Sequence, residues 1–240
     1  MTSTGQTSAR RHRVRDWFKK LFTYWTLIAI VSAIALAIFA DVGEDVAAKS
    51  TGAFDDAVRG WFLAHQNPAV YKIAAILTWI GSPTVMVIVA IAAGIWFYRG
   101  PGRSKAGVMV AAPAAGGLLA GGMKFLFGRA RPAGAALFNE KTFSFPSGHA
   151  ATSAAVMVTL CYVLARERII SWPAAILIGG IVPLIVGLTR LYLDVHWATD
   201  VVGGWTVGLF VAAMSAALYE RLRKSEPVGA EDAEAERLPA

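Results

Sequence analysis

The sequence contains few charged residues and a single cysteine. Asp, Glu, Lys and Arg make up only 16% of its 240 residues, whereas soluble domains carry about 25%. One Cys excludes a disulfide scaffold and a zinc module built from several cysteines. Hydrophobic residues supply 56% of the chain even when its glycines are left out, so too few charges remain to form a water-exposed surface. The composition therefore predicts an integral membrane protein.

Six apolar runs have roughly the length needed to cross about 30 Å of hydrocarbon. The first run is too long for the apolar region of a signal peptide, so we interpret it as an uncleaved span. Short basic loops alternate with longer polar ones, as the positive-inside rule requires when both termini are cytoplasmic. We expect an all-α bundle of six transmembrane helices, with spans at 21–40, 84–98, 106–127, 149–164, 170–188 and 201–219.

The regions outside this bundle have their own patterns. We expect a basic cytoplasmic N-terminus at 1–20, one membrane domain at 21–220 and a disordered acidic cytoplasmic tail at 221–240. The net charge of +7 then reflects the basic residues that flank the spans on the cytoplasmic side. We therefore predict no binding of nucleic acid.

The segment 41–83 lies between the first two spans, and a seventh span within it would invert the downstream topology and place the basic loops outside. Apolar residues recur in it at helical spacing, which predicts a helix on the outer membrane surface: Phe54, Val58, Trp61 and Phe62. The following run at 69–80 is too short to span alone and is broken by Gly81-Ser82-Pro83. We therefore expect an interfacial segment at 54–80 that dips into the membrane or packs on the bundle.

Three polar clusters interrupt the apolar pattern, and all fall on the outer side in this topology. Lys124 and Arg131 lie seven residues apart at the end of the third span, where topology requires no positive charge, although either could be a snorkelling or topogenic cation. Ser147, Gly148 and His149 precede the fourth span, where a helix N-terminus offers amides to an anion. Ser147 could instead be only a cap, and His149 only an interfacial imidazole.

The third cluster consists of Arg190, His196 and Asp200. Residues four apart on a helix share a face, so the carboxylate can fix the imidazole tautomer and leave the other ring nitrogen free to react. Three cations and a helix N-terminus together suit a phosphate dianion, and two histidines match a nucleophile and a proton donor. Histidines among cations do not suit a divalent ion, so we predict no metal and no cofactor.

In these segments the sequence resembles the type 2 phosphatidic acid phosphatase family, the membrane relatives of vanadium haloperoxidases. Its motifs K-x6-R-P, P-S-G-H and S-R-x5-H-x3-D occur in order within about residues 69–219, with Thr189 in place of Ser as the one departure. The resemblance implies that His196 forms a phosphohistidine, that Asp200 orients it and that His149 is the general acid. It also implies a set of phosphate-binding residues: Lys124, Arg131, Ser147, Gly148 and Arg190.

The resemblance implies a metal-independent lipid phosphatase of the bacterial inner membrane, with an extracytoplasmic site. Its partners would be water and a lipid phosphate in the bilayer, with vanadate or phosphate as inhibitors. The motifs contact only phosphate, so phosphatidic acid, phosphatidylglycerophosphate, undecaprenyl diphosphate and lipid A phosphates all stay open. Segments 41–83 and 139–145 would select among them, while Arg129 and Asp194 could each tune the site, although we favour loop roles for both.

Two alternatives belong to other functional classes. A transporter or flippase could bind a phosphorylated headgroup without hydrolysing it, but it would have no use for the His196–Asp200 pair. A haloperoxidase could use bound vanadate, although six spans argue against the typically soluble haloperoxidases.

Overall fold

The structure is a computed structural model that describes residues 3–99, 103–138 and 141–225. In these ranges the chain forms eight α-helices and one short 3-10 helix: α1 (Ser3–Ala47), α2 (Gly52–Ala64), α3 (Pro68–Ile80), α4 (Pro83–Arg99), α5 (Arg103–Phe127), η1 (Ala133–Phe138), α6 (Gly148–Arg166), α7 (Trp172–Tyr192) and α8 (Ala198–Ser225). The predicted all-α fold is confirmed. From residue 226 onward, the predicted acidic tail lies outside the described ranges.

Five helices are each long and apolar enough to cross a membrane: Thr23–Ala47, Lys105–Phe127, Gly148–Arg166, Trp172–Tyr192 and Ala198–Arg223. A sixth candidate is α3 together with α4, which pass the same test only as a pair and are bent by 45°. The 17 residues of α4 rise only about 26 Å, so the predicted span at 84–98 is not among the helices that pass this test alone. Pro83 has no backbone N–H to continue the helix, which explains the bend.

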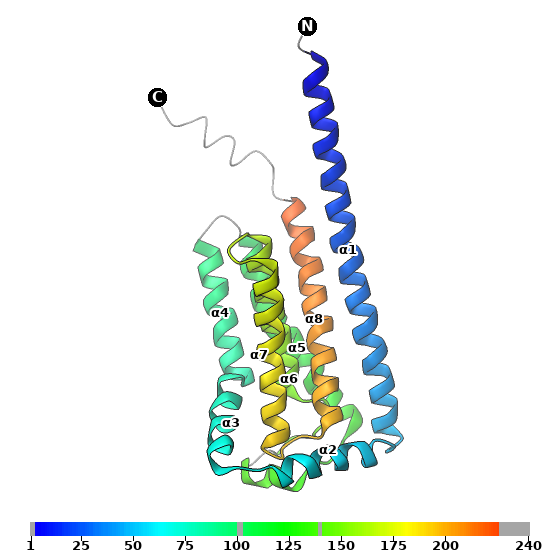
Figure 1. Cartoon of the computed structure of the whole chain (residues 1–240), viewed down its shortest axis with the longest axis vertical. Coiled ribbons are helices and arrows are strands. Elements are labelled where there is room, and N and C mark those ends of the chain that lie inside the picture. The colour runs from blue at the N-terminus through cyan, green and yellow to red at the C-terminus, as the bar shows by residue number, and fades with distance from the viewer. Residues whose placement is uncertain (1–2, 100–102, 139–140, 226–240) are drawn as a thin grey trace.

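The long helices run alongside one another, and α2 lies across one end of the bundle (Figure 1). α1 is a single helix that extends beyond the other helices at the opposite end (Figure 1). The predicted basic segment at 1–20 is therefore helical from Ser3 onward. At the end crossed by α2, helices α5 and α7 finish while α6 and α8 begin. Four helix ends therefore meet there.

Small residues allow α6 and α8 to approach closely. A Cβ on Gly204 would lie 2.6 Å from the carbonyl oxygen of Ser147, and one on Gly208 would lie 2.5 Å from that of Ala151. Those distances are too short for any side chain, so glycine is required at both positions. The contact brings the first turn of α6 against the first turns of α8.

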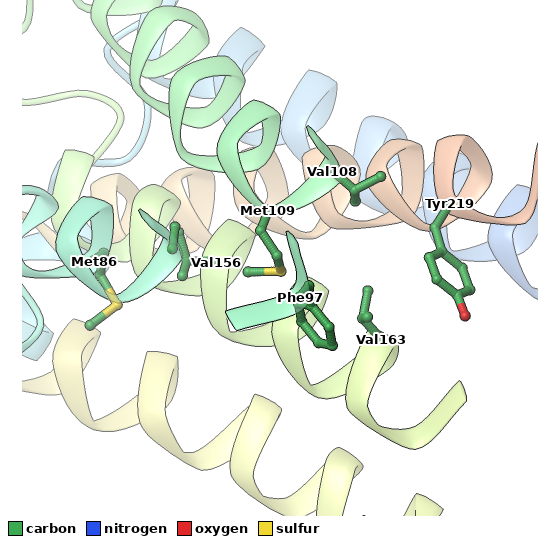
Figure 2. Close-up of a cluster of buried hydrophobic side chains, with 8 residues drawn as sticks. Met86, Phe97, Val108, Met109, Val156, Val163 and Tyr219 are labelled. Carbon is green, nitrogen blue, oxygen red and sulfur yellow. The ribbon is translucent and has the colours of Figure 1, made fainter. Parts of the chain in front are cut away.

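A buried apolar cluster connects α4, α5, α6 and α8 (Figure 2). Its members are Met86, Ala90, Phe97, Val108, Met109, Val156, Val163 and Tyr219. On the outside of the bundle, large apolar side chains remain exposed, with Leu118 at 76%, Phe125 at 80% and Ile176 at 73%. Such a surface is unfavourable in water and is suited to contact with lipid tails.

A helix, α2, is present where a surface helix was predicted, and its residues differ widely in solvent exposure. Phe54 and Trp61 on the apolar stripe are more than half exposed, whereas Asp55 is 1% exposed. Arg59, one turn after Asp55, forms a bidentate ion pair with Asp194, at 2.6 and 2.9 Å. The side of α2 that carries Asp55 and Arg59 therefore packs on the protein, whereas Phe54 and Trp61 remain exposed and suit a membrane surface.

Candidate active site

The residues predicted from the three motifs meet at the end of the bundle crossed by α2. Lys124 and Arg190 lie in the last turns of α5 and α7, while His149 and Asp200 lie in the first turns of α6 and α8. The imidazole of His149 lies within electrostatic range of four of the others: Arg190, His196, Arg131 and Lys124. Helix ends thus bring together side chains that are far apart in the sequence.

His196 lies in the loop between α7 and α8 and is held from both sides. Its Nδ1 lies 3.2 Å from Oδ2 of Asp200, and its Nε2 lies 3.0 Å from Nη1 of Arg131. A guanidinium can only donate, so Nε2 must be the acceptor and Nδ1 must carry the proton. The hydroxyl of Ser144 donates to the same Oδ2 of Asp200. Nε2 therefore presents its lone pair on the side that faces the cations.

The buried position of His196 keeps its ring neutral. Burial lowers the pKa of His196 to about 4; the hydrogen bond and charge of Asp200 oppose this shift, and the charges of Arg131 and Arg190 add to it. At neutral pH the ring is therefore unprotonated at Nε2. That form is the one able to act as a nucleophile.

The three cations of the predicted phosphate-binding set make hydrogen bonds to neutral oxygens. Arg131 donates to the carbonyls of Thr142 at 2.7 Å and Val195 at 2.9 Å, and Lys124 donates to the carbonyl of Phe143. The buried guanidinium of Arg190 donates to the Thr78 hydroxyl at 3.1 Å. A phosphate dianion is a stronger acceptor than a carbonyl or hydroxyl, so these donors suit a phosphate-binding role.

The start of α6 contributes a hydroxyl and first-turn amides. Ser147 occupies the N-cap position but makes no capping bond. Its buried hydroxyl has no hydrogen-bond partner among the residues that the structure describes. The Ser147 N–H donates to the carbonyl of Asp200 at 2.9 Å, so this amide is already used, whereas the amide of Gly148 has no acceptor within its own helix. Any contribution of Ser147 to anion binding would thus come from its side chain.

Thr189, the one departure from the family motifs, has a local role. Its hydroxyl donates to the carbonyl of Val186 within α7 at 2.6 Å. Ser could make the same bond, which explains why the substitution is tolerated.

Two residues for which loop roles were favoured form buried ion pairs. Arg129 binds Asp200 at 2.8 Å and Asp55 at 2.5 Å, and Asp194 receives the bidentate pair from Arg59. Asp55 and Arg59 were not among the residues predicted from the sequence. Their i, i+4 spacing beside the apolar stripe of α2 was the available signal, because charged side chains on one side of a helix at a membrane border require partners.

Comparison with known proteins identifies the family. Residues 105–224 match the PAP2 superfamily. Phosphatidylglycerophosphatase B of Bacillus subtilis (strain 168) is 30% identical over 176 residues, which span 71% of this chain and 85% of that protein. The undecaprenyl-diphosphatase of Sulfolobus acidocaldarius is 33% identical over 73 residues, which span 30% of this chain and 32% of that protein.

Two further likenesses agree with this match. Lipid A 1-phosphatase of Porphyromonas gingivalis is 38% identical over 118 residues, which cover 47% of this chain and 24% of that protein. The crystal structure of a transmembrane PAP2 type phosphatidylglycerolphosphate phosphatase from Bacillus subtilis has the same fold, with a TM-score of 0.72 at 23% identity. The structural alignment covers 81% of this chain and 98% of the Bacillus subtilis chain. The sequence match, the shared fold and the three motifs lead to one conclusion: this chain belongs to the PAP2 superfamily.

Proposed function

We propose that this protein is a metal-independent lipid phosphatase that works through a phosphohistidine on His196. The observation that carries the proposal is the geometry of this buried imidazole, with Nδ1 directed at Asp200 and Nε2 at Arg131. A bound phosphate would take the place of Nε2 as the acceptor for Arg131. The nucleophilic nitrogen would then face the phosphorus atom.

The reaction would proceed in two displacements. Nε2 of His196 attacks phosphorus, the bond from phosphorus to the lipid oxygen breaks, and His149 donates a proton to the departing oxygen. A water molecule then attacks the phosphohistidine and gives its proton to His149, which releases inorganic phosphate. Charge on the phosphoryl oxygens would be stabilised by this group of donors: Lys124, Arg131, Ser147, Gly148 and Arg190.

The lipid carrying the phosphate is proposed from the relatives. The relatives reported above are named for phosphatidylglycerophosphate, undecaprenyl diphosphate and lipid A, and all three names describe phosphatases. This favours hydrolysis over transport. Phosphatidylglycerophosphate is our first candidate, because the relative named for it aligns over 85% of its length.

We also propose that the site faces the extracytoplasmic side of the bacterial inner membrane. The opposite end of the bundle carries several basic residues in short loops or at helix ends: Arg99, Lys105, Arg166, Arg168, Arg221 and Arg223. Basic residues of this kind favour the cytoplasmic side. Both termini would then be cytoplasmic.

The decisive experiment measures phosphate release by the purified protein in detergent with EDTA present. The panel contains phosphatidylglycerophosphate, phosphatidic acid, undecaprenyl diphosphate and lipid A 1-phosphate. We expect release from at least one lipid, a loss of at least about 1,000-fold in His196→Ala, and acid-labile labelling of wild type by a radiolabelled substrate. Full activity in His196→Ala, or strict dependence on a divalent metal, would refute the mechanism. A transporter would release no phosphate from any lipid.

A further inference from the structure

The orientation of Asp200 depends on bonds to both of its carboxylate oxygens. Oδ2 accepts the hydroxyl of Ser144, the N–H of Trp197 at 2.8 Å and Nδ1 of His196 at 3.2 Å. Oδ1 accepts Nη1 of Arg129 at 2.8 Å. With one oxygen held by Arg129, the carboxylate cannot rotate about its last side-chain bond without breaking a charge-assisted hydrogen bond.

Arg129 is itself held from its other side by α2. Its Nη2 donates to Oδ2 of Asp55 at 2.5 Å and to the hydroxyl of Thr51 at 2.9 Å. Asp55 also accepts the backbone N–H of Thr199 at 3.0 Å and its hydroxyl at 2.8 Å. Asp55 therefore binds the first turn of α8 and the guanidinium at once, and α2 is joined to the turn that carries Asp200.

The guanidinium is suited to this bridge for two physical reasons. Asp55 and Asp200 are both buried, at 1% and 0% exposure, and a buried carboxylate is unfavourable without a partner. The planar fork of Arg129 reaches both carboxylates in fixed directions, whereas a Lys ammonium acts as a single point charge. The ring of Trp197 lies 5.6 Å from the guanidinium carbon and packs beside it.

We propose that Arg129, held by Asp55, is a positioning residue for this reaction. It holds the Asp200 carboxylate in the one orientation that accepts Nδ1–H of His196, and so directs Nε2 at phosphorus. This inference rests on the proposed phosphatase function. It also gives α2 a role in catalysis, because Asp55 of α2 holds the guanidinium that orients Asp200.

The test measures kcat and KM for Arg129→Gln with the panel lipid that wild type hydrolyses fastest. We expect kcat to fall about 10- to 100-fold, the loss typical when a group that orients a functional histidine is removed. KM should stay within about twofold, because Arg129 binds carboxylates of the protein. Arg129→Lys should recover part of the lost kcat, since it keeps the charge but not the bidentate geometry.

Arg59→Gln is the matched control. It removes the other guanidinium–carboxylate pair that docks α2, between Arg59 and Asp194, and leaves the bonds of Asp200 in place. Its kcat should stay within about twofold of wild type. An equal fall in Arg59→Gln and Arg129→Gln would overturn the inference, because general docking of α2 would then explain both. Wild-type kcat in Arg129→Gln would overturn it as well.

A double variant tests the path through Asp55. If Asp55 acts through Arg129, then Asp55→Asn combined with Arg129→Gln should lower kcat no further than Arg129→Gln alone. If Arg129→Gln fails to elute as a folded protein, Asp55→Asn alone reports the same fall in kcat at constant KM, and an unchanged kcat there refutes the inference. Inactive wild type on every lipid would refute the proposed function instead, which separates the two failures.

Discussion

Buried charge occurs at both ends of the bundle, but its partners differ. At the end away from α2, Arg166 binds both oxygens of Glu220, at 2.5 and 2.9 Å, and Lys105 binds Glu167 at 2.8 Å. Tyr162 also donates to Glu220 at 2.8 Å. Each of these two cations is matched by a carboxylate on another element. These ion pairs link α5 to the loop after α6, and α6 to α8. We call such carboxylate-matched cations closed pairs.

At the end crossed by α2, the contacts divide into two kinds. Asp55 and Asp200 share Arg129 in closed pairs, whereas Arg131 and Lys124 donate to carbonyl oxygens. A closed pair resists exchange because separating it leaves a buried charge without a partner. A bond to a neutral carbonyl can be exchanged for one to an anion at a net gain. The comparison suggests that one end is built for cohesion and the other for binding phosphate.

The largest effect expected from this comparison is on turnover at the binding end. Arg131→Gln should lower kcat/KM by about 100- to 1,000-fold, because it removes a charged donor facing the phosphoryl group. Its melting temperature should change little, since the hydrogen bonds that the structure describes for Arg131 run to uncharged oxygen and nitrogen atoms. Phosphate release and a thermal melt in the same detergent measure both quantities. A loss below tenfold would show that Arg131 does not contact the transferred phosphate.

A stability effect is expected at the cohesive end. Glu220→Gln should destabilise the protein by about 3 kcal/mol, because it leaves the buried Arg166 with only a neutral partner. The kcat measured well below the melting temperature should stay near the wild-type value, since this end lies far from His196. Thermal melts monitored by tryptophan fluorescence provide the measurement, with Arg131→Gln as the counterpart. If Glu220→Gln lost turnover but kept its stability, the division between the two ends would be wrong.

The smallest effect concerns pH. The pKa of His196 is lowered from 6.5 to about 4. The neutral ring is the proposed nucleophile, so its reactive form should persist from pH 7 down to about pH 4. Below that value the neutral fraction falls about tenfold per pH unit. The imidazole nitrogen shifts of labelled protein, assigned by their loss in His196→Gln, measure the protonation directly. A midpoint near 6.5 would contradict the buried, neutral state of His196.

The motifs were informative because their chemistry lies close along the chain. His196 and Asp200 are four residues apart, and the predicted contact is present at 3.2 Å. His196 lies in the loop before α8, so the two residues do not share a helical face as the spacing had suggested. The Arg129–Asp55 pair joins residues 74 apart in the sequence, and no local pattern links them. The position of Arg129 two residues before Arg131 suggested an ordinary loop cation. Only the docking of α2 against α8 gives that guanidinium two carboxylates.

The sequence by itself determined the helical membrane fold and the chemistry at the helix ends. A backbone in hydrocarbon must satisfy its own hydrogen bonds, so long apolar runs can only be helices, and charged residues at their borders stand out. The tertiary structure decided that α3 and α4 form one bent candidate span, that the side of α2 carrying Asp55 and Arg59 turns inward, and which partner each buried charge has. Periodicity is set within a turn or two of helix, whereas the partner of a buried charge is set by how distant helices pack.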